Sequence, residues 1–299
     1  MISDSFIVIR ELKIQNANAL SSAFTIGFPA MTAWLGAVHA IQRKFNEIEC
    51  FEQLEFNQIT VACHDFKLHT YKGRGDYDWS IVGTGNPLTK EGARPSFIEE
   101  GRCNLCVSLI IGCNNLSRFD FDDFETRLES ILHSRTKVAG GDILEFANIE
   151  YKKPDSENEK QKLLYSLMPG YVLIERRDLV KASMENGDDA LDAILDHVAL
   201  HNVCEKTESG EVSWSIKRKT SGWVIPIAVG FQGISELVEP GKTFNQRDPS
   251  VPHRFAEAIV TLGEFKMPHR LRFDDAFWHY EYRKEENLYL CKNFEGEKE

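Results

Sequence analysis

The run Asn104-Leu-Cys-Val-Ser-Leu-Ile-Ile-Gly-Cys113 is apolar almost throughout. A strand with one wet face alternates polar and apolar residues, whereas a strand covered on both faces reads as a continuous apolar run. We therefore predict a buried central strand over these residues. The segments on either side of it decide which kind of sheet it joins.

Two strands and a helix are predicted upstream of this run. Phe6 to Ile14 places apolar side chains at every second position, which indicates a strand. Pro29 suits the first turn of a helix, and the residues after it repeat at helical spacing. The apolar stripe of that helix consists of Met31, Trp34, Leu35, Val38, Ile41 and Phe45. A second strand begins at Ile59 and runs toward Tyr71.

A helix and a strand are predicted downstream. The helix has the apolar stripe Phe121, Phe124, Leu128, Ile131 and Leu132. After the break at Gly140-Gly141, residues Ile143 to Ile149 form a fourth strand. The order strand, helix, strand, strand, helix, strand predicts an α+β, ferredoxin-like body over residues 1–150, as in RNA-recognition motifs and many unrelated proteins.

A long glycine-rich segment, residues 72–101, separates the second and third strands. Connections of this length are usually functional or disordered. The aromatic side chains Tyr77, Trp79 and Phe97 favour an ordered excursion, which we predict to be an inserted hairpin. It carries Arg74 and Arg94.

Residues 151–299 are predicted to be additions packed on this body and not an independent domain. A polar linker spans Lys152 to Lys162, and Leu163 to Glu175 is strand-like around Pro169-Gly170. A short helix is predicted over residues 190–198. A strand follows at Trp223 to Val229, and Phe255 to Phe265 has helical spacing.

Composition restricts the possible partners and location. The 299 residues carry a formal net charge of −11, which opposes non-specific binding of nucleic acid but permits a local basic groove. No apolar run reaches the roughly 18 residues that indicate a membrane span. The start lacks signal-peptide features, and an odd count of 7 cysteines does not indicate a disulfide framework. We expect a cytoplasmic protein without a membrane partner.

We predict no metal, no cofactor and no catalytic centre. Cys103 and Cys106, the one CxxC pair, would face opposite sides of a strand. His39, His64, His69 and His269 form no short-range cluster, and His64 and His69 are expected on opposite faces of their strand. No GxxxxGK[ST], GxSxG or HExxH motif occurs.

The polar stretch Gln15-Asn-Ala-Asn-Ala-Leu-Ser-Ser22 is the best candidate for RNA contact. We expect a loop between the first strand and the first helix. Uncharged amide and hydroxyl groups bind phosphates, ribose hydroxyls and base edges, and a helix N-terminus attracts anions. The predicted contacts are Asn16, Asn18, Ser21 and Ser22. An ordinary loop that caps the helix remains the alternative.

This stretch, followed by Gly27-Phe-Pro-Ala-Met-Thr-Ala-Trp-Leu-Gly-Ala-Val-His-Ala-Ile-Gln-Arg-Lys44, resembles the opening of the Csy-two family. The resemblance continues in order through blocks spread over most of the chain: Asn86-Pro-Leu, Glu99-Glu-Gly-Arg102, Ala139-Gly-Gly141, Met168-Pro-Gly-Tyr171, Gly222-Trp223, Pro226, Gly263-Glu264 and Pro268-His-Arg270. It implies a Cas-five-type RAMP protein, a non-catalytic subunit of the type I-F CRISPR surveillance (Csy) complex. Such a subunit binds the 5′ handle of the CRISPR RNA, pairs with the large subunit, adjoins the backbone subunits and meets target DNA through the complex.

On this interpretation His39, Arg43 and Lys44 line the same edge as the polar stretch. Arg74 and Arg94 would reach RNA from the inserted hairpin, and Arg102 belongs to the same set. Two alternatives stay open. One is a RAMP endoribonuclease that processes CRISPR RNA, which the scattered histidines disfavour. The other is a purely structural adaptor without RNA contact.

Overall fold

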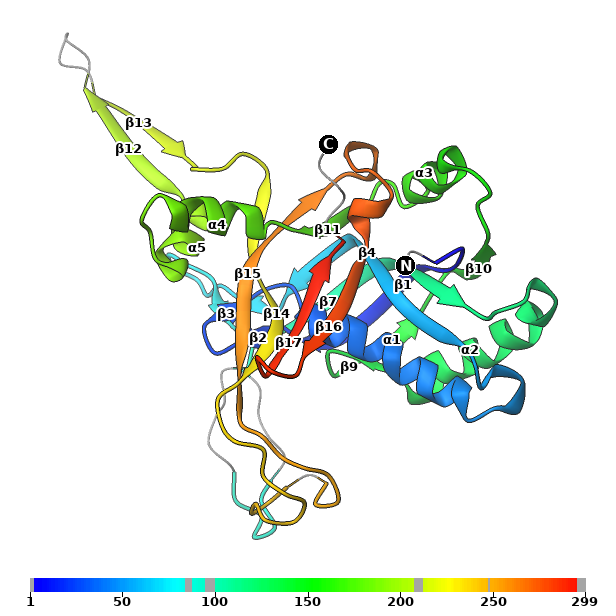
Figure 1. Ribbon diagram of the computed structural model, residues 1–299. Helices are drawn as coiled ribbons and strands as arrows, with labels where there is room; N and C mark the ends of the chain where they lie inside the picture. The colour runs from blue at the N-terminus through cyan, green and yellow to red at the C-terminus, as the bar shows by residue number, and fades with distance from the viewer. Residues whose placement is uncertain (1–2, 84–87, 95–99, 207–211, 247, 295–299) are drawn as a thin grey trace.

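The computed structural model describes residues 3–83, 88–94, 100–206, 212–246 and 248–294 (Figure 1). Its helices are α1 Met31–Asn46, α2 Phe121–Arg135, α3 Glu157–Tyr165, α4 Arg177–Glu185 and α5 Ala190–Val198, with short 3₁₀ turns η1 Glu49–Phe51, η2 Arg118–Asp120, η3 Pro268–Arg270 and η4 Asp274–Ala276. Its strands are β1 Ser5–Asn18, β2 Leu20–Ser22, β3 Thr25–Ile26, β4 Glu55–Leu68, β5 Thr70–Tyr71, β6 Ser80–Ile81, β7 Arg102–Asn114, β8 Lys137–Val138, β9 Gly141–Glu145, β10 Asn148–Lys152, β11 Tyr171–Glu175, β12 His201–Lys206, β13 Val212–Lys217, β14 Trp223–Gly233, β15 Ala256–Lys266, β16 Trp278–Arg283 and β17 Leu288–Asn293.

The predicted element order of the first half is confirmed. Strands lie side by side in the order β9, β1, β7 and β4, all antiparallel, with α1 and α2 as the two connecting helices. The register places Leu109 of β7 between Ile9 and Val61. The apolar run that predicted a central strand is therefore β7, which is buried along most of its length.

The fourth predicted strand is two strands. β9 and β10 both pair with β1, with Ile143 opposite Ile14 and Ile149 opposite Ile9. Between them the amide of Ala147 donates to the carbonyl of Arg10, 2.8 Å away. The single strand predicted over Ile143 to Ile149 is wrong because the chain bends there and continues along the same edge of β1.

The stripe of α1 is buried as its spacing predicts: Met31, Trp34, Leu35, Val38, Ile41 and Phe45. The helix lies between two layers, since its stripe packs on β1, β4 and β7 and it also contacts β14, β16 and β17 (Figure 1). Phe28, just before it, stacks on Trp34 and meets the edge of the Phe265 ring at 5.2 Å. One hydrophobic core thus includes residues from both halves of the chain.

Strands from the second half close a ring on β4. The sheet continues through β15, β14, β17 and β16, and β11 pairs with both β15 and β4. The helical spacing read from Phe255 to Phe265 is wrong, because these residues form β15, which pairs with β14 along nearly its whole length. The strand predicted at Trp223 to Val229 is confirmed and extends to Gly233.

Helix α3 occupies sequence that we expected to be linker and strand. Its N-cap Ser156 accepts a hydrogen bond from the amide of Glu159, and Leu163 and Leu164 are buried beneath it. The strand-like pattern from residue 163 therefore begins as helix, and only β11 is strand. The helix at residues 190–198 is confirmed as α5, whereas α4 was not predicted.

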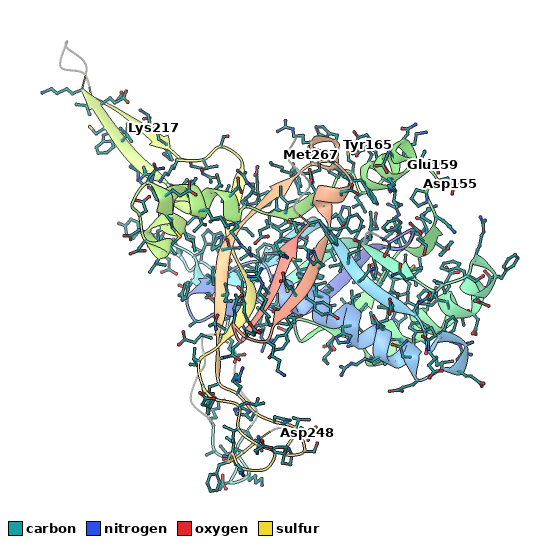
Figure 2. All side chains as sticks on the ribbon, viewed as in Figure 1. Asp155, Glu159, Tyr165, Lys217, Asp248 and Met267 are labelled. Carbon is teal, nitrogen blue, oxygen red and sulfur yellow. The ribbon has the colours of Figure 1, made fainter. Side chains whose placement is uncertain are left out.

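Two parts of the molecule project from the body. The ribbon of β12 and β13 extends beyond α4 and α5, at the upper left of Figure 1, and Lys217 lies on it in Figure 2. The connection between β14 and β15 forms the lower projection, where Asp248 lies. Within and just before the predicted insertion at residues 72–101, β5 pairs with β6 to form a short hairpin over residues 70–81. Residues 84–87 and 95–99, which include Phe97, lie outside the described residues.

Candidate nucleic-acid interface

Among the described residues, only part of the second face of the central sheet is covered. Helix α3 and the segment from η3 to η4 pack over Phe6, Val8 and Ile110. Farther along, Lys13, Cys106 and Asp65 form a cross-strand row on the same face that is partly or fully exposed. We call this uncovered part the open sheet face and define it by these residues: Glu11, Lys13, Gln15, Asp65, Lys67, His69, Asn104 and Cys106.

Asn104 organises one end of the open sheet face. Its side-chain oxygen Oδ1 accepts from the amide of Asn16 at 3.0 Å and from Nε2 of His69 at 3.0 Å. Asn16 lies at a β-bulge in β1 with φ of 59°, in the left-handed region. The Asn16 side chain is exposed and makes no hydrogen bond among the described residues. It is therefore available to a ligand.

Asn18 is placed differently, because both of its side-chain polar atoms bind Leu20. Oδ1 accepts from the Leu20 amide and Nδ2 donates to the Leu20 carbonyl, each at 3.0 Å. Its own amide donates to the carbonyl of Ala139. Asn18 thus holds the turn from β1 into β2, and it does not cap α1, whose N-cap Ala30 has no side-chain cap hydrogen bond.

Arg102 lies opposite Asn18 at the start of β7. One guanidinium nitrogen, Nη2, donates to Glu100 Oε2 at 2.7 Å, and the other, Nη1, points toward Gly140. The Nε atom is buried without a hydrogen-bond partner among the described residues. A buried guanidinium N–H without a partner is uncommon in folded proteins.

The turn from β8 to β9 packs against this end of the sheet. Ala139 and Gly140 both have positive φ, 50° and 75°. A side chain at Gly141 would lie 2.8 Å from the backbone of Ala17, so only glycine lets the turn approach β1. The candidate interface consists of this turn together with Asn16, Asn18 and Arg102.

Ser21 and Ser22 do not lie in a loop. Together with Thr25 they form the small β2–β3 hairpin, in which the Thr25 hydroxyl lies 3.0 Å from Ser21 Oγ and 2.7 Å from Ser22 Oγ. The predicted loop over residues 16–22 is wrong because the chain stays in strand conformation to Ser22, apart from Ala19, and the hairpin separates it from α1. Its tip residue Phe24 is exposed.

Arg43 and Lys44 lie at the opposite end of the sheet. Phe45 stacks on Phe124, which contacts Phe56, and Phe56 pairs with Cys113 at the far end of β7 from Arg102. The expectation that they line the same edge as Asn16 is wrong because α1 runs back along the sheet. His39, midway along α1, stacks on Tyr280 of β16. RNA contact by these three residues stays a prediction on a separate surface.

Arg74 lies in the turn between β5 and β6, whereas Arg94 lies beyond β6, and both are exposed. The turn near Arg74 is ordered by its own contacts, because Asp76 accepts from the Gly73 amide at 2.7 Å and Lys72 donates to the Tyr77 carbonyl. Neither arginine forms an ion pair among the described residues. Both are available to an anionic partner.

His64 and His69 lie on the same face of the sheet, and the expectation of opposite faces is wrong. His64 Nε2 lies 2.7 Å from Ser108 Oγ, while His69 contacts Asn104, an even number of residues away on β7. The register shift between Cys63 and Asp65 inserts one extra residue and reverses the alternation. Burial lowers the pKa of His64, and the positive charge of Arg10 lowers it further against the opposing effect of Glu11.

Sequence reasoning missed Asn104, Lys13 and Lys67. Asn104 was interpreted only as the beginning of an apolar strand. A lone amide side chain in such a run is the one sequence feature that could have indicated a polar site there. Cys103 is buried, and burial raises its pKa to about 12, while Cys106 lies on the open sheet face. No three His, Cys, Asp or Glu side chains gather into a metal site within the described ranges. None of the described helices has the length and apolar character to cross a membrane.

Comparison with known proteins assigns the family. The family model of the CRISPR-associated protein (Cas_Csy2) matches residues 7–291. The CRISPR-associated protein Csy2 of Pseudomonas aeruginosa strain UCBPP-PA14 is 30% identical over 312 aligned positions, which cover 96% of this chain and 94% of the relative. The family-model match extends from β1 to β17. The chain therefore belongs to the Csy2 family of CRISPR-associated proteins.

Proposed function

We propose that this protein is a non-catalytic subunit of the type I-F CRISPR surveillance complex, in which it binds the 5′ handle of the CRISPR RNA. It pairs with the large subunit, adjoins a backbone subunit and reaches target DNA only through the assembled complex. Membership of the Csy2 family supports the place in a Csy complex. We expect it to act in the cytoplasm, without a cofactor.

The observation that carries the RNA assignment is the exposed Asn16 side chain at the same sheet end as Arg102, whose guanidinium is partly exposed. A guanidinium and an amide at one sheet end match the groups that bind phosphate, ribose and base edges. The Ala139–Gly141 turn brings backbone close to the same place. Arg74 and Arg94 would add charge from the inserted hairpin, while Asn18, Ser21 and Ser22 contribute mainly by shaping the turn.

The strand order β9, β1, β7, β4 with two crossing helices supports a ferredoxin-like, RAMP-type body over residues 1–150. Residues 151–299 are best described as additions to it, because their strands close on β4 and their apolar side chains join the core around α1. The RNA does not need aromatic stacking on the central strands, since the open sheet face carries polar side chains.

A second feature supports assembly with other subunits. On the β12–β13 ribbon, Val212, Trp214 and Ile216 share one face and are exposed, with Cys204 opposite Trp214. A two-stranded ribbon is marginally stable alone, and an exposed apolar face marks a protein contact. The ribbon is our proposed docking element for a partner subunit.

The endoribonuclease alternative is disfavoured by the placement of the histidines. Ser108 and Asn104, the partners of His64 and His69, are separated by about 13 Å along β7 at the usual rise per strand residue. One scissile phosphate cannot contact both. His39 and His269 lie on other elements.

The test is to express the whole operon with a tag on this chain, isolate the complex and sequence the bound RNA. We expect partner subunits and one RNA species with a fixed 5′ end. Precursor RNA that accumulates uncut in His64→Ala or His69→Ala would favour the enzyme. A complex that forms without RNA contact by this chain in crosslinking would favour the adaptor.

A further inference from the structure

A basic pocket lies where helix α3 meets the edge of the open sheet face. It has a volume of about 330 Å³. Figure 2 labels Glu159 and, just before the helix, Asp155 in this part of the molecule. The lining residues are Arg10, Glu150, Lys152, Lys153, Pro154, Glu159, Lys162, Leu163 and Ser166.

The inner wall of the pocket is a fixed ion cluster with excess positive charge. Arg10 Nε donates to Glu150 Oε1 at 2.7 Å, and Lys152 Nζ lies 2.7 Å from the other oxygen of the same carboxylate. Arg10 also donates to the carbonyl and the hydroxyl of Ser166. Two cations therefore share one carboxylate, which leaves the cluster net positive.

The outer wall adds two exposed lysines. Neither Lys153 nor Lys162 forms an ion pair among the described residues. The remaining acid, Glu159, accepts from the Asp155 amide at 2.9 Å and is thereby held at the rim. Four cations thus face two carboxylates in a protein whose net charge is −11. This local reversal of sign favours an anion.

The pocket is continuous with the open sheet face. Arg10 precedes Glu11, whose amide donates to Ser108 Oγ, and Ser108 also bonds His64. Along β1 the distance from Arg10 to Asn18 is about 26 Å at the usual rise per residue. On its other side Lys153 borders a second pocket lined by Asp4, Glu55 and Asp120, which repels phosphate. The open sheet face is charge-balanced, with Glu11 and Asp65 beside Lys13 and Lys67, so it repels an anionic strand less than the second pocket does.

We propose that this pocket binds a backbone phosphate of the nucleic-acid strand whose end is held at Asn16 and Arg102. The proposal rests on the proposed RNA-binding function and adds a second, sequence-independent anchor to it. The ammonium groups of Lys153 and Lys162 contact the phosphate oxygens. Arg10 and Lys152 supply charge from behind while they hold the Glu150 carboxylate.

The test uses the reconstituted complex, a fluorescein-labelled single-stranded RNA that begins with the co-purified handle sequence, and a salt titration. The pocket variant is Lys153→Gln with Lys162→Gln. The matched control is Lys181→Gln with Lys284→Gln, two exposed lysines without an ion pair among the described residues. Both variants lose the same formal charge, so any difference between them reports position and not net charge.

We expect the pocket variant to lose roughly five- to tenfold in affinity and to show a shallower slope of log Kd against log salt by about 0.7, the value for one phosphate on a single strand. The affinity and the salt slope of the control variant should change little, and so should the melting temperatures of both variants. Equal slopes and affinities in the two variants would overturn the pocket assignment. Failure of the unmodified complex to retain RNA would instead overturn the proposed function.

A second measurement separates a bound strand from free phosphate. The melting temperature of the isolated chain is recorded with inorganic phosphate against chloride at equal ionic strength. A stabilisation that is lost in the pocket variant, together with its weaker RNA binding, supports the proposal. The same stabilisation with unchanged RNA binding would show a free-phosphate site and overturn the assignment to the strand.

Discussion

Trp278, near the end of the chain, pairs with Ile59 of β4, and its indole donates a 2.7 Å hydrogen bond to the carbonyl of Leu173 in β11. One residue of β16 thus connects to two further strands of the ring, to β4 through its backbone and to β11 through its side chain. It is fully buried, as is Phe277 beside it. The central sheet and the later strands therefore share both backbone pairing and core, which makes the two halves dependent on each other.

A truncated chain of residues 1–152 should consequently fail to fold cooperatively. It keeps α1 but loses β14, β16 and β17, which cover the outer side of that helix. The truncation exposes several large apolar side chains, and burial of each contributes about 1.5–3 kcal/mol. The summed loss exceeds the unfolding free energy of an ordinary domain. Urea unfolding followed by circular dichroism, with dye binding to exposed apolar surface, measures this. A sharp transition without dye binding would mean that the first half is an independent domain.

Substitution of Asn16 by glycine should separate RNA binding from stability. Glycine adopts the φ of 59° without cost, and the Asn104 oxygen keeps its bond to the residue 16 amide. We expect unfolding free energy within about 1 kcal/mol of the unmodified protein. RNA retention in the reconstituted complex should weaken roughly tenfold, or about 1.4 kcal/mol, because a ligand group loses its partner.

Asn18→Ala is the comparison for that variant. Removal of the Asn18 amide leaves the two polar groups of Leu20 without partners, so stability should fall by about 1–3 kcal/mol. If Asn16→Gly destabilises the protein and keeps full RNA retention, the Asn16 side chain is structural and not a ligand contact.

Trp214→Ala should weaken assembly and leave the isolated chain stable. The indole is 71% exposed, so its removal costs the monomer little burial. We expect an unchanged melting temperature and at least a tenfold loss of partner subunits in a pull-down, since a central interface tryptophan typically contributes 2 kcal/mol or more. Phe119→Ala is the control, because Phe119 is an even more exposed aromatic side chain, at 99%, but lies at η2, away from the ribbon. Equal losses in both variants would contradict the docking role.

The contribution of Glu150 to stability should depend on pH. Burial alone would raise the pKa of this carboxyl, but hydrogen bonds and charge from Arg10 and Lys152 outweigh it and lower the pKa to about 2. Because its pKa is lower in the folded state, the Glu150 carboxyl stabilises the protein fully at pH values above its unfolded pKa of about 4.3. This stabilisation is lost as the pH falls toward 2. The difference in unfolding free energy between the unmodified protein and Glu150→Gln should therefore shrink between pH 5 and about pH 2. A constant difference over that window would show that the ion cluster does not stabilise the fold.

The elements that periodicity predicted well are those with a single buried face or a fully buried run. The stripe of α1 and the apolar run of β7 report burial directly, so both were found. β15 was misread because its half-buried stretch Ala258, Ile259 and Val260 blurs the alternation, and apolar spacing alone cannot distinguish such a strand from a helix. The strand conformation of these residues depends on pairing with β11 and β14, which the spacing of apolar residues does not report.

The candidate site was less accessible from sequence than the fold. Small polar residues from Gln15 to Ser22 look like a loop, yet a bulge in β1 and the separate β2–β3 hairpin keep nearly all of them in strand conformation. A bulge also placed His64 and His69 on one face. Neither bulge has a sequence signal, because backbone pairing with β7 produces both. The direction in which α1 returns, which separates Arg43 from Asn16, likewise depends on the tertiary packing of Phe45.

The ring that closes on β4 also protects this chain from aggregation through its strand edges. An unpaired strand edge invites another chain to add a strand, which leads to aggregation. In the described part of the molecule, the outer edge of β4 is shared between Trp278 and the start of β11, and the other side of the central sheet ends in the short strands β8 and β10. In the proposed complex, the main sheet would then meet neighbouring subunits through side chains, which lets each interface be specific for its own partner.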